Sequence, residues 1–226
     1  MRHVGPVEIW FIVAALRWTV LLSVIALGLG GAGGLVVATL RVLPAAPARW
    51  LAAGFIELFQ DTPLLLQLFV AYFGIGLFGW NIDAWSAATI ALSLHSAAFL
   101  GEIWRGSIQA VPATQWEAAR ALSLPWLLSL RLVILPQALR MTVAPTVGFL
   151  VQLIKGTSVT ALIGLIEITR AGQLVSNVTL QPFTVYGIVA LLYVALCWPL
   201  SLASRRLESR LSRSTNRGLG AARAGS

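Results

Sequence analysis

The sequence predicts an all-α integral membrane protein with about five transmembrane helices. Of its 226 residues, 58% are hydrophobic and only 11% are charged, whereas soluble domains carry about 25% charged residues. Several runs without any charged residue are long enough to cross a bilayer, which takes about 20 apolar residues in a helix. The basic residues gather between and after these runs, as expected for a membrane topology.

Each span is placed on an uncharged run. Runs 18–40, 62–82 and 84–101 define the first three, and the fourth follows Arg140 and continues past Lys155. Pro182 separates an outer loop from the fifth span, because proline opens a helix readily but disrupts its interior. The expected transmembrane domain covers residues 18–204, with spans at about 18–40, 58–80, 84–104, 138–163 and 184–204.

The basic residues also predict an orientation, because Lys and Arg in short loops stay on the cytoplasmic side. Those between spans one and two, between spans three and four, and after span five can all lie inside together. Arg2, Arg17 and Arg170 then remain outside, and Lys155 lies within a span. The N-terminus is therefore expected outside and the C-terminus in the cytoplasm.

The two ends are expected to differ from the spans. Residues 1–17 suit an outer interfacial segment that leads into span one, and a signal peptide remains an alternative for the same stretch. Residues 205–226 form a basic cytoplasmic tail that is expected to be disordered at its end.

Composition excludes several functions. The net charge of +8 could suggest nucleic acid, but the basic residues lie where membrane topology places them and no basic aromatic platform accompanies them, so nucleic acid is not an expected partner. Cys197 lies in an apolar run and suits packing. His95 stands alone, which argues against a metal site and favours a hydrogen-bonded interior residue.

The loop at about 106–136, between spans three and four, is too long for a plain turn. Its stretch ATQWEAARAL is rich in helix formers. Ser123 then interrupts the helix, Pro125 suits the first turn of a second short helix, and Pro136 is expected to end it. A helix, a turn and a helix are therefore predicted on the cytoplasmic side.

One surface of the first helix has almost no side-chain bulk, because Ala118, Ala119 and Ala121 leave it small. Such a surface could enter a groove on a partner. The alternative is an amphipathic hairpin that rests on lipid headgroups, although this does not explain why Glu117 and Arg120 lie beside the small residues. From the pattern alone, both interpretations stay open.

The stretch EAARALSLPWLLSLRLVILP resembles the EAA loop of permease subunits from bacterial ATP-binding cassette (ABC) importers. Two further stretches, DTPLLLQLFVAYFG and LIKGTSVTALIGLIEITRAGQ, are similar to the branch that imports polar amino acids such as histidine, glutamine, glutamate and arginine. Ser123 departs from the family pattern, which has glycine there, so the turn geometry is in question. The loop positions expected to couple to an ATPase are Glu117, Ala118, Ala119, Ser123, Leu135 and Pro136, and Ile134 also matches the family motif.

The resemblance implies partners and a location. An importer of this kind has two ATP-binding subunits, which bind the ATP and Mg²⁺, a second permease copy or sister permease, and an extracytoplasmic amino-acid-binding protein. The chain itself would hold no cofactor, would not be an enzyme, and would lie among the lipids of the bacterial inner membrane. Related solutes, namely an opine, an ectoine-like compound or cystine, remain alternatives.

Polar residues at membrane depth are costly and are therefore candidates for the substrate pathway. Each has a plainer alternative: helix capping for Asp61 and Thr62, a local ion pair with Arg105 for Glu102, and structural pairing or gating for Lys155. Glu167 and Arg170, on the outer side, suit either docking of a binding protein or a solvated pair. The pathway candidates are Asp61, Thr62, Glu102, Lys155, Thr157 and Ser158.

Two other classes of function are weaker. An intramembrane enzyme could use His95, Glu102 or Asp61 as an acid or base, but no paired nucleophile accompanies them. A channel or scaffold would not need an ATPase-docking loop. The glycine-rich stretch GLGGAGGL lacks the Lys-Ser/Thr ending of a phosphate loop, so Gly30 and Gly34 are expected to let two helices pack closely.

Overall fold

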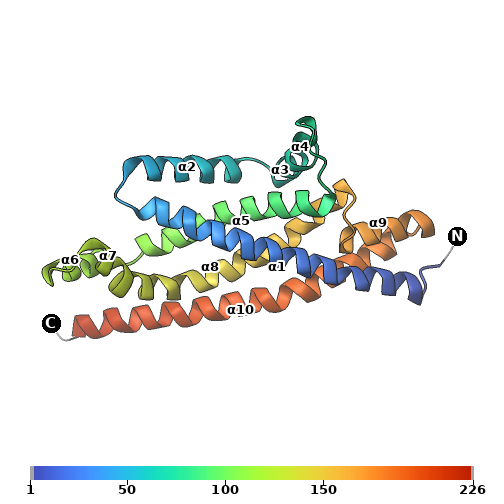
Figure 1. Ribbon diagram of the computed structural model, residues 1–226. Coiled ribbons are helices and arrows are strands. Elements are labelled where there is room, and N and C mark those ends of the chain that lie inside the picture. Colours follow the sequence, from blue (N-terminus) through green and yellow to red (C-terminus); the bar gives the residue numbers. More distant parts are fainter. Residues whose placement is uncertain (1–2, 225–226) are drawn as a thin grey trace.

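The computed structural model describes residues 3–224 and is helical throughout its regular elements. The long helices run lengthwise beside one another, with α6 and α7 at one end of the bundle and α9 at the other (Figure 1). In chain order the elements are α1 (Pro6–Val42), α2 (Ala46–Asp61), α3 (Leu64–Phe69), the π-helical η1 (Val70–Gly74), α4 (Ile75–Leu77), α5 (Ala84–Gln109), α6 (Ala113–Ala121), α7 (Trp126–Leu128), the π-helical η2 (Ser129–Ile134), α8 (Leu135–Gly156), the 3₁₀ segment η3 (Thr157–Ile163), α9 (Ile168–Thr179) and α10 (Pro182–Ala224).

Four helices of the described chain are long and apolar enough to cross a membrane, and a bent pair raises the number to as many as 5. The four cover Pro6–Val42, Ala84–Gln109, Trp126–Ile163 and Pro182–Ser209. The first begins well before residue 18, because Pro6 opens it and the Glu8 carboxylate accepts a hydrogen bond from the Gly5 N–H at 3.1 Å. The segment expected to precede span one is thus helical from Pro6.

The second expected span is not straight. Helices Ala46–Asp61 and Leu64–Leu77 meet at an angle of 102°, because Pro63 cannot continue the hydrogen bonding of α2 and stands in extended backbone before α3. The Gln67 side-chain amide donates to the Phe59 and Thr62 carbonyls at 2.8 and 2.9 Å, which holds this elbow together.

The expectation that Pro136 ends a short helix was wrong. A helical path continues from Trp126 to Ile163, and Pro136 lies in the first turn of α8. The π-helical segment η2 comes directly before it. A π turn shifts the hydrogen-bonding pattern by one residue, which lets the helix pass a residue that has no N–H.

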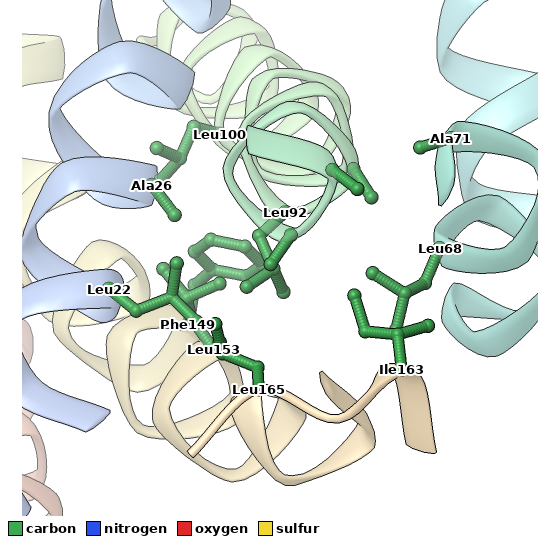
Figure 2. Packing of buried hydrophobic residues seen from close by; sticks show 13 residues of the cluster. Leu22, Ala26, Leu68, Ala71, Leu92, Leu100, Phe149, Leu153, Ile163 and Leu165 are labelled. Atoms are coloured by element: carbon green, nitrogen blue, oxygen red, sulfur yellow. The ribbon is translucent and has the colours of Figure 1, made fainter. Parts of the chain in front are cut away.

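The main core joins four parts of the chain (Figure 2). Leu22 of α1, Leu92 of α5 and Phe149 of α8 are buried together, and Leu68 of α3 packs against the same cluster. The full set of buried residues is Leu22, Ala26, Leu68, Ala71, Ala87, Ala88, Ala91, Leu92, Leu100, Phe149, Leu153, Ile163 and Leu165.

Glycines bring α1 close to α5, as the spacing of Gly30 and Gly34 predicted. A Cβ added to Gly30 would lie 2.3 Å from the Ser96 Cβ, and one added to Gly34 would lie 3.0 Å from the Leu100 Cβ. No side chain other than hydrogen fits at the first of these contacts. The two backbones therefore pack directly against each other.

Candidate functional site

The predicted helix–turn–helix is present as α6, a turn, and the helix formed by α7 and η2, and we call it the hairpin. Its turn is a regular helix C-cap. The Leu124 N–H donates to the Ala119 carbonyl at 3.1 Å, and the Ser123 N–H donates to the Arg120 carbonyl at 2.8 Å. This pair of bonds defines a Schellman motif, whose central residue adopts a left-handed conformation. Ser123 adopts that conformation, with φ of 56°. The turn is therefore formed with serine at the left-handed position.

The hairpin exposes only part of the expected coupling surface. Glu117 and Ala118 are exposed on α6, and Leu122 beside the turn is 74% exposed. Ala119 is instead buried, with 2% of its surface accessible, because this face of α6 packs against the helix that returns after the turn. Ala119 thus serves the hairpin's own packing and does not belong to the exposed small-residue surface.

A small core of its own fixes the hairpin to the spanning helices. Leu130 and Ile134 of η2 pack with Ile108 near the end of α5 and with Ala138 of α8. Leu135 is partly buried against the same cluster, whereas Pro136 is exposed. A movement of α6 would therefore be transmitted to α5 and α8.

A hydrogen bond adds to this connection. The Gln137 side-chain amide donates to the Gln115 side-chain carbonyl of α6 at 3.2 Å and to the Val133 carbonyl at 2.8 Å. Gln115 and Gln137 were not singled out from the sequence, since lone glutamines carry no recognisable spacing.

Several pathway candidates lie around the elbow between α2 and α3. Asp61 is exposed as the last residue of α2, and the Thr62 hydroxyl donates to the Leu58 carbonyl at 2.6 Å. The end of α8 comes close to the same place, since a Cβ added to Gly156 would lie 3.1 Å from Leu64 Cδ2. Lys155, which precedes Gly156, is exposed.

The side chains of the remaining pathway candidates form hydrogen bonds with residues close to them in the chain. The Ser158 hydroxyl donates to the Lys155 carbonyl, and the buried Thr157 hydroxyl donates to the Ile154 carbonyl, both at 2.7 Å. Glu102 forms a two-bond ion pair with Arg105, with Arg105 Nε 2.7 Å from one carboxylate oxygen. The predicted local pair is thus present, and the structure does not bring Glu102 to the elbow.

The expectation that Glu167 is an exposed residue on the outer side was wrong. It is fully buried, so neither a solvated pair with Arg170 nor an exposed docking residue describes it. Its carboxylate accepts from the Arg170 backbone N–H and from the Tyr193 hydroxyl, both at 2.8 Å, while the Arg170 guanidinium donates to Gln173. Burial raises the pKa of the Glu167 carboxyl, although these hydrogen bonds oppose the shift. The carboxylate caps α9 and ties it to α10.

His95 lies among aromatic rings. Its ring centroid is 4.5 Å from that of Phe99 and 6.5 Å from that of Phe149. Its Nδ1 is buried with no hydrogen-bond partner among the described residues, so the expected hydrogen-bonded role was wrong for this atom. Across residues 3–224, no group of three or more His, Cys, Asp or Glu side chains is placed to hold a metal ion.

The chain has relatives among membrane transport proteins. Residues 30–213 match the family described as "Binding-protein-dependent transport system inner membrane component". The chain is 37% identical over 196 residues to the probable glutamine ABC transporter permease protein GlnM of Bacillus subtilis (strain 168), covering 87% of this chain and 91% of that one. It is 33% identical over 208 residues to the arginine transport system permease protein ArtQ of the same organism, covering 90% and 94%.

Solved structures agree with the sequence relatives. The crystal structure of an amino acid ABC transporter with histidines matches with a TM-score of 0.84 and 32% identity, covering 88% of this chain and 94% of that one. An inward-facing methionine ABC transporter, MetNI, has the same fold at 20% identity, with a TM-score of 0.78 and coverage of 92% and 99%. The chain belongs to the family of inner-membrane components of binding-protein-dependent transport systems.

Proposed function

We propose that this chain is the membrane-spanning permease subunit of an ABC importer that carries a polar amino acid into the cell. The observation that carries the proposal is the hairpin at one end of the bundle, which exposes Glu117 and Ala118 and is packed onto α5 and α8. The relatives named for glutamine and arginine support the class of solute.

ATP hydrolysis belongs to partners in this proposal. Two ATP-binding subunits bind ATP and Mg²⁺, and each accepts a hairpin from one of two permease chains, either identical or sister subunits. Glu117 offers a carboxylate to a basic or backbone donor, while Ser123 shapes the turn and Ala119 and Leu135 hold the hairpin's interior. Pro136 lies where the hairpin continues into α8, which carries the movement into the membrane.

The two ends of the chain lie on opposite sides of the inner membrane. We place the C-terminus and the hairpin in the cytoplasm and the N-terminus outside, in keeping with the basic residues around the hairpin and after α10. Figure 1 has the end of α10 and α6 at one end of the bundle and the start of α1 at the other. An extracytoplasmic binding protein delivers the solute at the end where α9 lies.

The solute path is proposed to pass the elbow. Lys155 is exposed beside Gly156, and Asp61, Thr62 and Ser158 supply polar groups nearby in the chain or the fold. A cation at this place suits the carboxylate of an amino acid. Glu102 and Thr157 form their hydrogen bonds within α5 and at the end of α8, so in this proposal they support the local helix and do not contact the solute.

Co-purification tests the coupling proposal. The full chain is isolated from its native membrane in mild detergent, and retained proteins are identified by mass spectrometry for the wild type, Glu117→Arg and Glu208→Arg. Glu208 is also exposed, on α10, so it controls for charge reversal alone. We expect an ATPase with the wild type and with Glu208→Arg, and its loss with Glu117→Arg.

The same cells then report on the solute. Uptake of radiolabelled glutamine, arginine and cystine is measured with and without the chain. ATP-dependent uptake of glutamine or arginine supports the proposal, whereas uptake of cystine alone would favour the alternative solute. A well-folded wild type that retains no ATPase in several detergents would overturn the importer proposal and favour a channel or scaffold.

A further inference from the structure

A cavity of about 230 Å³ lies where the end of α1 and the start of α2 meet the hairpin. Arg41 and Arg49 line it together with Trp116 of α6 and Trp126 of α7. A second cavity of about 310 Å³ shares both tryptophans and adds Arg120. The two cavities therefore place arginines on both sides of one pair of indole rings, at the end of the bundle where α1 turns into α2 (Figure 1).

Among the described residues, the lining of the first cavity holds two arginines and no acidic residue. Arg41 Nε is buried without a hydrogen-bond partner in the described part of the chain. The Arg49 guanidinium is fixed at the wall, because its NH1 group donates to the Leu43 and Pro44 carbonyls at 3.3 and 2.8 Å. The acidic residue near Arg41 is Glu102, which is already engaged in two bonds with Arg105.

Two guanidinium groups on the wall of one cavity suit an anion with several oxygen acceptors, because each presents several N–H donors. The surroundings indicate where that anion comes from. Trp50 and Leu51 follow Arg49 on α2 and are 79% and 75% exposed. Arginine and tryptophan together at the end of a spanning helix mark the level of lipid headgroups, and exposed apolar residues next to them suit acyl chains.

We propose that this cavity binds the phosphate of an anionic phospholipid. The phosphate oxygens accept hydrogen bonds from Arg41 and Arg49, Trp116 and Trp126 flank the headgroup, and the acyl chains lie along the exposed apolar residues of α2. A lipid held there joins the α1–α2 turn to α6 and α7, and so stabilises the hairpin against the spanning helices. The proposal depends neither on the solute carried nor on the identity of the ATPase.

The test uses the full chain in mild detergent with whatever subunits it retains. Its thermal unfolding midpoint is measured while phosphatidylglycerol or phosphatidylcholine with the same acyl chains is titrated. We expect phosphatidylglycerol to raise the midpoint further, and Arg41→Gln to need about fivefold more of it for half the effect, as removing one arginine near an anionic lipid implies. Arg131→Gln removes an exposed arginine that lines neither cavity, and should behave like the wild type.

Arg49→Gln provides a second variant at the wall of the same cavity, in case Arg41→Gln does not fold, and it should also weaken the response. Equal responses to the two lipids, or an equal loss in Arg131→Gln, would overturn the proposal. Glycerol phosphate is added in a separate arm at matched concentrations. If glycerol phosphate protects as well as phosphatidylglycerol, the site takes a free phosphate. If phosphatidylglycerol protects only the chain that has lost its ATPase, an acidic segment of the ATPase fills the cavity. Either result overturns the lipid assignment.

Discussion

Ser123 shows how one residue can keep a turn that its side chain disfavours. A left-handed conformation brings the Cβ of an L-residue close to the following carbonyl, at a cost of about 1–2 kcal/mol, and glycine avoids this cost. Ser123 nevertheless has φ of 56°, because the hydrogen bonds to Ala119 and Arg120 close the motif around it. The surrounding hairpin therefore imposes the conformation on serine.

Ser123→Gly should stabilise the protein by about 0.5–1 kcal/mol, since it relieves the left-handed strain but adds freedom to the unfolded chain. Thermal unfolding in detergent would show a higher midpoint. Ala121→Gly, at the exposed last residue of α6, should instead lower stability by about 0.5–1 kcal/mol. A similar effect of the two glycines would contradict the strain assigned to Ser123.

At the scale of the elements, the contact between α1 and α5 depends on small residues. Gly30 faces Ser96, and Gly101 faces Val37, where an added Cβ would lie 2.6 Å from Cγ1. Without a hydrophobic driving force between helices inside a bilayer, such close backbone contact is what holds two spans together. Since α5 continues to the hairpin, the position of α1 bears on coupling.

Gly30→Ala should destabilise the protein by about 1–3 kcal/mol, because the added methyl group overlaps Ser96 and the helices must separate. Gly28→Ala is the matched control, since a Cβ at Gly28 meets nothing within 4 Å. Thermal unfolding of both variants in the same detergent measures the difference. Equal midpoints for the two would show that α1 and α5 do not rely on this contact.

At the scale of the whole molecule, two polar regions lie apart. The hairpin with Glu117 is at one end of the bundle, while Lys155 lies near the elbow between α2 and α3. The proposed importer uses the first for energy coupling and the second for the solute. A substitution at Glu117 should therefore impair uptake through loss of the ATPase, whereas a substitution at Lys155 should impair uptake while the ATPase is retained.

Lys155→Met should lower uptake of the transported amino acid by about tenfold or more, because a hydrogen bond to a charged group contributes about 1.5–3 kcal/mol. Retention of the ATPase in co-purification should be unchanged, in contrast to Glu117→Arg. Lys155→Arg keeps the cation and should keep most of the uptake. Normal uptake by Lys155→Met would remove Lys155 from the proposed path.

Some features could be predicted because they depend on residues close together in the chain. The lengths of the apolar runs predict spanning helices, Glu102 and Arg105 pair across one helical turn, and Gly30 and Gly34 show the spacing of a close helix contact. The break at Pro63 also has a local cause, yet its angle of 102° depends on how α3 packs against α5 and η3.

The membrane class, the family and the presence of a helix–turn–helix follow from the amino-acid sequence, because apolar length and a contiguous motif are local properties. The inward position of Ala119, the burial of Glu167 against Tyr193 of α10, and the cavity that Arg41 and Arg49 share with two tryptophans come from tertiary packing. Each of these depends on which distant elements come into contact. Residue type and spacing along one helix do not specify which distant elements touch. The packing of α1, α5, α8 and α10 specifies those contacts.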